Sequence, residues 1–72
     1  MRFSDQVRIF RTLKGMSQRE LGQAVGVSYT TISQIENGYS QPSEEARAAL
    51  VKVLDITEER VSLLGQLAQA AS

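Results

Sequence analysis

The chain has 72 residues, and its eight lysines and arginines balance its eight aspartates and glutamates, so the formal net charge is zero. The absence of cysteine excludes disulfides, and without cysteine or histidine we expect no zinc site, no other metal and no cofactor. No apolar run approaches the roughly 20 residues of a membrane span and no signal-peptide pattern follows Met1, so we expect a single soluble, cytoplasmic domain over residues 1–72.

The first predicted helix covers about residues 5–14. Ser4 stands at the expected N-cap, and Gly15 can adopt the left-handed conformation that ends many helices. Ile9 and Leu13 widen the apolar arc beyond what an amphipathic helix needs. Part of that arc therefore looks too exposed for apolar side chains.

The second predicted helix covers about residues 18–25. Ser17 and Glu20 have capping-box spacing, so each side chain can bond the backbone N–H of the other. Gly22 inside this helix costs roughly 1 kcal/mol relative to alanine, which suggests that the next helix crosses close over it. Gly26 has the backbone freedom that a turn requires.

The third predicted helix covers about residues 29–37, with Ser28 as its N-cap and Gly38 at its end. Together with the second helix and the Gly26 corner it has the spacing of a helix-turn-helix, in which the second helix is presented as a probe of the DNA major groove. Its outward face carries uncharged side chains that can hydrogen bond to base edges, namely Tyr29, Thr30, Ser33 and Gln34.

Two more helices are predicted after a loop that contains Pro42. The fourth covers about residues 44–54 after the N-cap Ser43, and the fifth begins after the N-cap Thr57; both open with two glutamates, which favour a helix N-terminus. No segment alternates like a strand, so the fold class is all-α with five helices. Three apolar residues of the fifth helix are left over once its core stripe is assigned: Leu63, Leu67 and Ala70.

The motifs in this order resemble the phage-repressor and Cro type of helix-turn-helix protein, a compact five-helix, lambda-repressor-like DNA-binding fold. With Arg11 and a later Leu54-Asp55-Ile56-Thr57, they cover most of residues 5–64 at the family's spacing. They are Ser17-Gln18-Arg19-Glu20-Leu21, Gly26-Val27-Ser28, Ile32-Ser33-Gln34-Ile35-Glu36-Asn37-Gly38 and Pro42-Ser43.

The resemblance implies roles for individual residues. Tyr29, Thr30 and Gln34 match positions that touch base edges, with Ser33 a weaker candidate. The implied phosphate contacts are Ser17, Gln18, Asn37 and Tyr39, and the implied structural ion pair is Arg11 with Glu36. Simpler readings stay open: a solvated Gln18, Asn37 as a helix cap only, Tyr39 as a lid on the core, and two solvated charges at Arg11 and Glu36.

The chain also departs from the family pattern. Gly22 stands where family members usually have alanine, and Asp55 replaces a common helix-ending glycine. Tyr29 breaks a pattern that pairs two glutamines across the two helices, and Arg47 stands where a large apolar residue is common. The recognition helix and the loop after it carry no lysine or arginine, so we expect weak binding by a monomer.

We therefore expect a sequence-specific DNA-binding transcriptional regulator, a repressor that binds a pseudo-palindromic operator in double-stranded DNA as a homodimer. Residues 65–72 would be a dimerisation extension or a linker, with Leu63, Leu67 and Ala70 at the dimer interface. These leucines could instead pack back onto Ile9 and Leu13. The sequence offers no sign of an enzyme, since no histidine or cysteine could serve as nucleophile or base.

The neutral charge leaves a second function open, because many DNA-binding domains are basic. Residues 1–43 carry five basic and three acidic side chains, a net charge of +2, whereas residues 44–72 carry three basic and five acidic ones, a net charge of −2. One half could face phosphate while the other faces away, unless this division is chance. The alternative is a protein-interaction module, such as an antitoxin or antirepressor, that holds a protein partner with its C-terminal helix.

Overall fold

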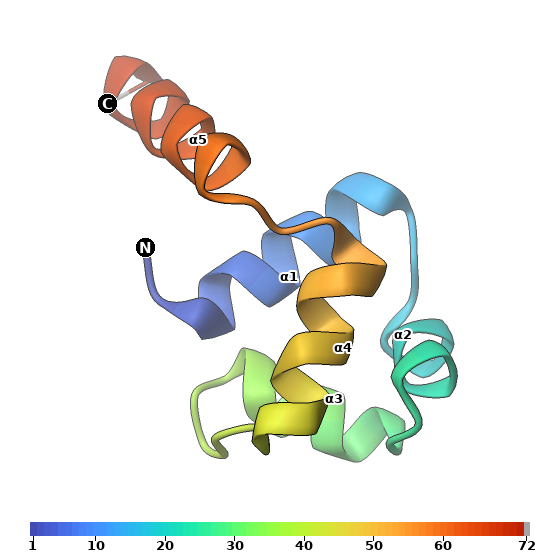
Figure 1. Ribbon diagram of the computed structural model, residues 1–72. Coiled ribbons are helices and arrows are strands. Elements are labelled where there is room, and N and C mark those ends of the chain that lie inside the picture. Colours follow the sequence, from blue (N-terminus) through green and yellow to red (C-terminus); the bar gives the residue numbers. More distant parts are fainter. Residues whose placement is uncertain (72) are drawn as a thin grey trace.

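The computed structural model describes residues 1–71, which form five α-helices joined by short turns and contain no strand. Helices α1–α4 pack around one core, and α5 projects from this body (Figure 1). The all-α, five-helix prediction is confirmed. The helices are α1 (Phe3–Lys14), α2 (Gln18–Val25), α3 (Tyr29–Glu36), α4 (Glu44–Leu54) and α5 (Glu58–Ala71). The predicted C-terminal extension falls within α5, apart from Ser72, which lies outside the described residues.

The core consists of apolar side chains from the first four helices, each at most 2% exposed: Val7, Phe10, Leu21, Ile32, Ile35, Leu50 and Leu54. Val61 and Leu64 of α5 pack against this core while remaining partly exposed. The buried positions recur at three- and four-residue spacing within α1, α3 and α4, which is the periodicity of one helix face. Burial of these faces fixes which side of α3 is left for solvent.

Four of the five helix starts follow the predicted capping chemistry. Ser17, Ser28 and Ser43 each accept a hydrogen bond from the backbone N–H three residues later, and Thr57 does the same for α5. These bonds satisfy N–H groups that have no partner inside the helix. The starts of these four helices are therefore set by local chemistry.

The predicted start of α1 is wrong. The helix begins at Phe3, one residue before the expected cap Ser4, and Arg2 occupies the N-cap without a side-chain hydrogen bond. Phe3 packs against the core, and its ring lies beneath the Arg47 guanidinium, 4.0 Å from the ring centroid. Tertiary packing of Phe3 thus outweighs the local capping preference of serine.

The C-terminal end of α3 also differs slightly from the prediction. The last helical residue is Glu36 rather than Asn37, and Asn37 is the C-cap. Its side-chain Nδ2 donates to the Ser33 carbonyl at 2.8 Å, which satisfies one of the free carbonyls of the last turn. The α4 helix ends at Leu54 as expected, and its C-cap Asp55 adopts the left-handed conformation (φ 55°, ψ 49°).

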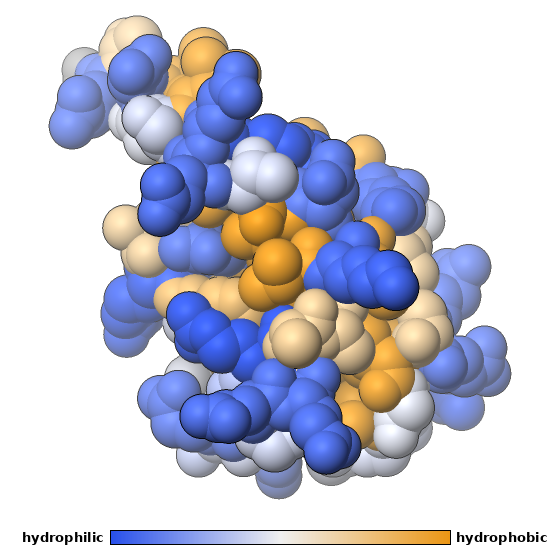
Figure 2. Space-filling model, in the orientation of Figure 1, coloured by the Kyte–Doolittle hydropathy of each residue, from blue (hydrophilic) through white to orange (hydrophobic). Residues whose placement is uncertain are grey.

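Helix α5 carries two exposed leucines. Leu63 and Leu67 are 56% and 58% exposed, and Leu13 of α1 is 63% exposed. All three border one hollow of about 130 Å³ between α1 and α5. The body of the protein does not bury these leucines, and hydrophobic surface is visible on the projecting helix (Figure 2). Within residues 1–71, no helix is both long and apolar enough to cross a membrane.

Candidate nucleic-acid interface

The turn that leads into α3 packs closely against Gly22 of α2. The carbonyl of Gly22 accepts hydrogen bonds from the N–H groups of Gly26 (2.8 Å) and Val27 (2.9 Å), and Gly26 has φ 83°. A Cβ added to Gly22 would lie 2.5 Å from the Val27 carbonyl oxygen. The close neighbour that the sequence predicts at this glycine is present, but it is the turn at Val27 and Ser28 and the first residue of α3, Tyr29, rather than the body of the next helix.

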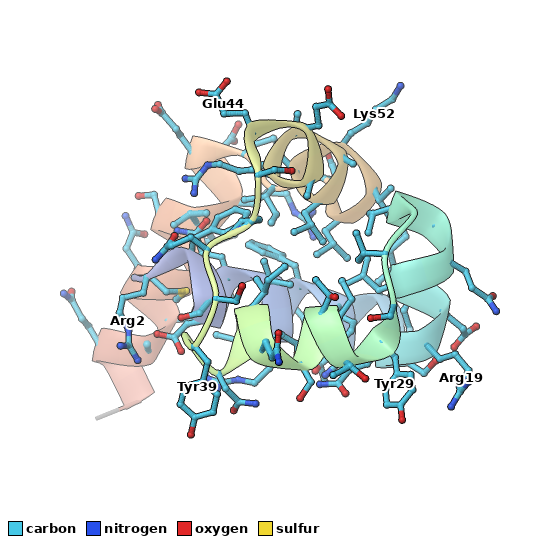
Figure 3. The ribbon with its side chains drawn as sticks, turned by 90° about the horizontal axis from the view of Figure 1, so that it is seen from below. Arg2, Arg19, Tyr29, Tyr39, Glu44 and Lys52 are labelled. Atoms are coloured by element: carbon cyan, nitrogen blue, oxygen red, sulfur yellow. The ribbon has the colours of Figure 1, made fainter. Side chains whose placement is uncertain are left out.

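The two faces of α3 are sharply different. Ile32 and Ile35 lie in the core, while Tyr29, Thr30 and Gln34 are exposed on the opposite side. Seen from below, Tyr29 and Tyr39 stand at opposite ends of α3 and point away from the body (Figure 3). The structure thus brings three of the four predicted base-contacting side chains together on one accessible helix face.

Ser33, the fourth predicted base contact, is placed less favourably. It is partly buried, and its hydroxyl and carbonyl oxygens both lie within hydrogen-bond distance of the Asn37 side-chain Nδ2, at 3.4 and 2.8 Å. The same bonds show that Asn37 caps its own helix. Its Oδ1 is not used by that cap, and the residue is exposed, so a contact with a ligand is still available to it.

At the start of α2, Ser17 and Glu20 form the predicted capping box. The Glu20 N–H donates to Ser17 Oγ at 3.0 Å, and the Ser17 N–H donates to Glu20 Oε1 at 2.9 Å. The Ser17 backbone N–H, and after it the Ser17 side chain, hydrogen-bond the Glu20 carboxylate and lower the pKa of Glu20. The Glu20 carboxylate is thus held against the N-terminus of its own helix.

Gln18 belongs to a hydrogen-bond network that its sequence context did not reveal. Its Nε2 donates to Glu36 Oε1 at 3.2 Å, so the first residue of α2 is tied to the last residue of α3. An amide nitrogen carries two hydrogens, and one of them remains for an acceptor outside the protein. The simple picture of a solvated Gln18 is therefore wrong, while a phosphate contact stays a prediction.

Arg11 is the centre of this network. Its Nε and Nη2 atoms donate to the Glu36 carboxylate at 2.6 and 3.0 Å, and its Nη1 donates to the Met16 carbonyl at 2.9 Å. The hydrogen bond with Glu36 raises the pKa of Arg11 more than burial lowers it. The expected ion pair is present, and it joins α1, the turn before α2 and the end of α3.

Tyr39 follows α3 in the loop and is 85% exposed. A residue that covered the core would be largely buried, so the reading of Tyr39 as a lid is excluded. At the other end of α3, the guanidinium of Arg19 lies over the Tyr29 ring, 4.6 Å from the centroid. Sequence spacing does not predict this contact, because residues ten positions apart meet here only through the angle between α2 and α3.

The comparisons with known proteins agree with this geometry. A helix-turn-helix family model matches residues 7–61, which include α2, the corner and α3. The chain is 32% identical over 57 residues to the uncharacterized HTH-type transcriptional regulator YazB of Bacillus subtilis, covering 79% of this chain and 83% of YazB. It also resembles the crystal structure of the clp gene regulator ClgR from Corynebacterium glutamicum, with a TM-score of 0.73 and 31% identity over 94% of this chain and 74% of that one.

Proposed function

Because the chain belongs to the helix-turn-helix family of transcriptional regulators, we propose that it represses transcription by binding a specific DNA sequence with α3 in the major groove. The fold and the family are those of DNA-binding regulators rather than of enzymes. The observation that best supports the proposal is the composition of the exposed α3 face, where Tyr29, Thr30 and Gln34 offer hydrogen-bonding groups and a methyl group without charge.

Individual side chains on this face suit different parts of a base pair. The Gln34 amide can bond adenine with a donor and an acceptor at once, and the Thr30 methyl can pack on the methyl group of thymine. Ser33 is partly buried and would reach bases only through water. We assign sequence reading mainly to Gln34 and Thr30.

The phosphate contacts would come from polar groups at the two ends of the α2–α3 unit. Ser17 and Gln18 stand at the N-terminus of α2, where free N–H groups and the helix dipole favour an anion. Asn37 and the exposed Tyr39 stand after the C-terminus of α3. These contacts position the protein on the duplex and carry no sequence information themselves.

A second copy of the chain completes the proposed complex. One recognition helix spans only a few base pairs, and regulators of this shape commonly bind two half-sites as symmetric dimers. Leu63, Leu67 and Ala70 are exposed along α5, next to the exposed Leu13. Residues 61–71 carry no charged side chain, so two copies of α5 can pack together without electrostatic repulsion or loss of ion pairs.

Repression is the simpler form of regulation for such a small protein. A bound dimer can block transcription by occupying the site, whereas activation needs an additional surface directed at the polymerase. The same apolar strip on α5 would serve a different protein partner if the chain were an antitoxin or antirepressor. DNA affinity measured against salt concentration separates the two functions, because phosphate contacts make affinity fall steeply with salt.

Selection of binding sequences from random DNA, followed by footprinting, tests the proposal directly. We expect two half-sites related by two-fold symmetry, with centres about one helical turn apart. Failure to enrich any sequence, together with absent binding at low salt, would contradict a DNA-binding function and favour the protein-partner alternative.

A further inference from the structure

Arg19 and Tyr29 form a stacked pair at the edge of the recognition surface. Arg19 is the second residue of α2, and Tyr29 is the first residue of α3. The guanidinium carbon lies 4.6 Å from the ring centroid, and both residues are exposed. Figure 3 shows the two side chains next to each other, away from the edge that carries Glu44 and Lys52. Such a contact restrains the guanidinium against the ring, and the exposure of both residues leaves its N–H groups accessible to a ligand.

Of the five basic side chains in residues 1–43, that of Arg19 is the one without a polar partner in the fold. The other four are engaged: Arg2 and Arg8 with Asp5, Arg11 with Glu36, and Lys14 with the Val53 carbonyl. The nearest acid in sequence, Glu20, is held in the capping box with Ser17. All five N–H donors of the Arg19 guanidinium are therefore available to a ligand, and binding one breaks no hydrogen bond within the fold.

We propose that Arg19 binds a backbone phosphate of the DNA and that Tyr29 is the platform that holds its guanidinium in position. This inference rests on the proposed DNA-binding function. In a helix-turn-helix the first helix crosses the sugar-phosphate backbone while the second enters the groove. A side chain that bridges the start of both helices lies at the rim of the groove, where the acceptors are phosphate oxygens, and a planar fork can bind such an oxygen pair bidentately. This supplies the cationic contact that α3 and its loop lack.

The phosphate contact of Arg19 can be tested by measuring fluorescence anisotropy with a short labelled duplex of mixed sequence over a series of salt concentrations. For each bound copy of the chain, Arg19→Gln should weaken binding about tenfold and reduce the steepness of the fall of log affinity with log salt by about 1. Arg19→Lys should keep the slope, because it keeps the charge. Lys52→Gln removes the same charge from exposed α4 on the other side of the molecule and should change neither quantity.

The role of Tyr29 follows from a double-mutant cycle on the same duplex. Tyr29→Phe keeps the ring and should keep the affinity, whereas Tyr29→Leu should lose several-fold, on the order of the stacking contribution. Arg19→Gln should cost less in the Tyr29→Leu background than in the wild type, because the unstacked guanidinium is no longer held in place. Thermal unfolding of each variant checks that these exposed substitutions leave the fold intact.

Several results would overturn the inference without touching the proposed function. Wild-type binding with an unchanged salt slope in Arg19→Gln would show that Arg19 does not contact phosphate. A change in the selected sequence with an unchanged slope would assign Arg19 to a base instead. Full additivity of the two substitutions would remove Tyr29 as the platform. Absence of DNA binding by the wild-type protein would instead refute the proposed function itself.

Discussion

The carboxylate of Glu36 at the end of α3 is buried and bound by the guanidinium of Arg11 from α1, with donor–acceptor distances of 2.6 and 3.0 Å. The Glu36 side chain is 3% exposed and that of Arg11 is 17% exposed. Gln18 shares the same carboxylate, so three helices meet at one acid. This carboxylate therefore ties the C-terminal end of α3 to the first two helices.

Replacing Arg11 with methionine should lower the free energy of unfolding by about 3 kcal/mol, because it leaves Glu36 buried without a compensating charge. Urea denaturation measures the loss. Arg8→Met is the matched control: Arg8 pairs with Asp5 on the surface with a half-exposed side chain, and such pairs contribute at most about 1 kcal/mol. Similar losses in the two variants would contradict a special role for the buried pair. Combining Arg11→Met with Glu36→Leu should recover much of the stability.

The capping box predicts a specific pH dependence. The pKa of Glu20 is lowered in the folded state from its ordinary value of 4.5, so on acidification the unfolded chain takes up this proton before the folded one does. The contribution of Glu20 to stability is therefore complete above the ordinary carboxyl range and is lost as the pH falls through the lowered pKa. Ser17→Ala should raise the pKa of Glu20 part of the way back, since the backbone bond remains. NMR titration of the Glu20 carboxyl carbon checks this; an unchanged pKa in the variant would contradict it.

Much of the local structure can be predicted from the sequence, because capping and apolar periodicity act within a few residues. The starts of α2, α3 and α4 follow from serine caps, and the ends of α1 and α2 follow from glycines. The α1 start was mispredicted because the burial of Phe3 is a tertiary effect. The Arg11–Glu36 pair came from resemblance to a family, not from spacing.

Contacts between helices could not be predicted from the sequence, because they too are tertiary effects. The bond from Gln18 to Glu36 and the stack of Arg19 on Tyr29 depend on where α2 crosses α3. Nothing in the spacing of these residues distinguishes them from solvated polar side chains. Gly22 was the exception, since a glycine that weakens a helix implies a close neighbour.

That close neighbour makes Gly22→Ala a test of the α2–α3 crossing. Alanine normally stabilises a helix interior by about 1 kcal/mol relative to glycine. At Gly22 the new methyl would lie 2.5 Å from the Val27 carbonyl oxygen, so we expect a net loss of about 1–3 kcal/mol instead. Gly65→Ala in α5 meets no atom within 4 Å and should follow the normal rule with a small gain. Thermal unfolding of both variants measures the difference in sign; a gain at Gly22 would mean that the corner can shift at little cost.

Gln34→Ala tests the assignment of base reading to α3. The amide is exposed and lies outside the core, so the substitution should leave the fold unchanged. It should weaken binding to the selected operator by about 1–3 kcal/mol while barely affecting a duplex of unrelated sequence. Competition binding with the two duplexes gives both numbers. An equal loss on both would show that Gln34 contacts the backbone rather than a base.

Leu67→Glu tests the proposed dimer surface on α5. Leu67 is 58% exposed in the monomer, so a glutamate there should not unfold the body, but it would place two charges in the apolar contact between copies. We expect a folded monomer by sedimentation and a large loss of operator affinity, because the two half-sites are then bound independently. Ala68→Glu adds the same charge one residue later on exposed α5, about 100° around the helix, and should leave the dimer intact. Global unfolding of Leu67→Glu would instead mean that Leu67 packs within its own chain, and a wild-type monomer at concentrations that saturate the operator would refute the dimer.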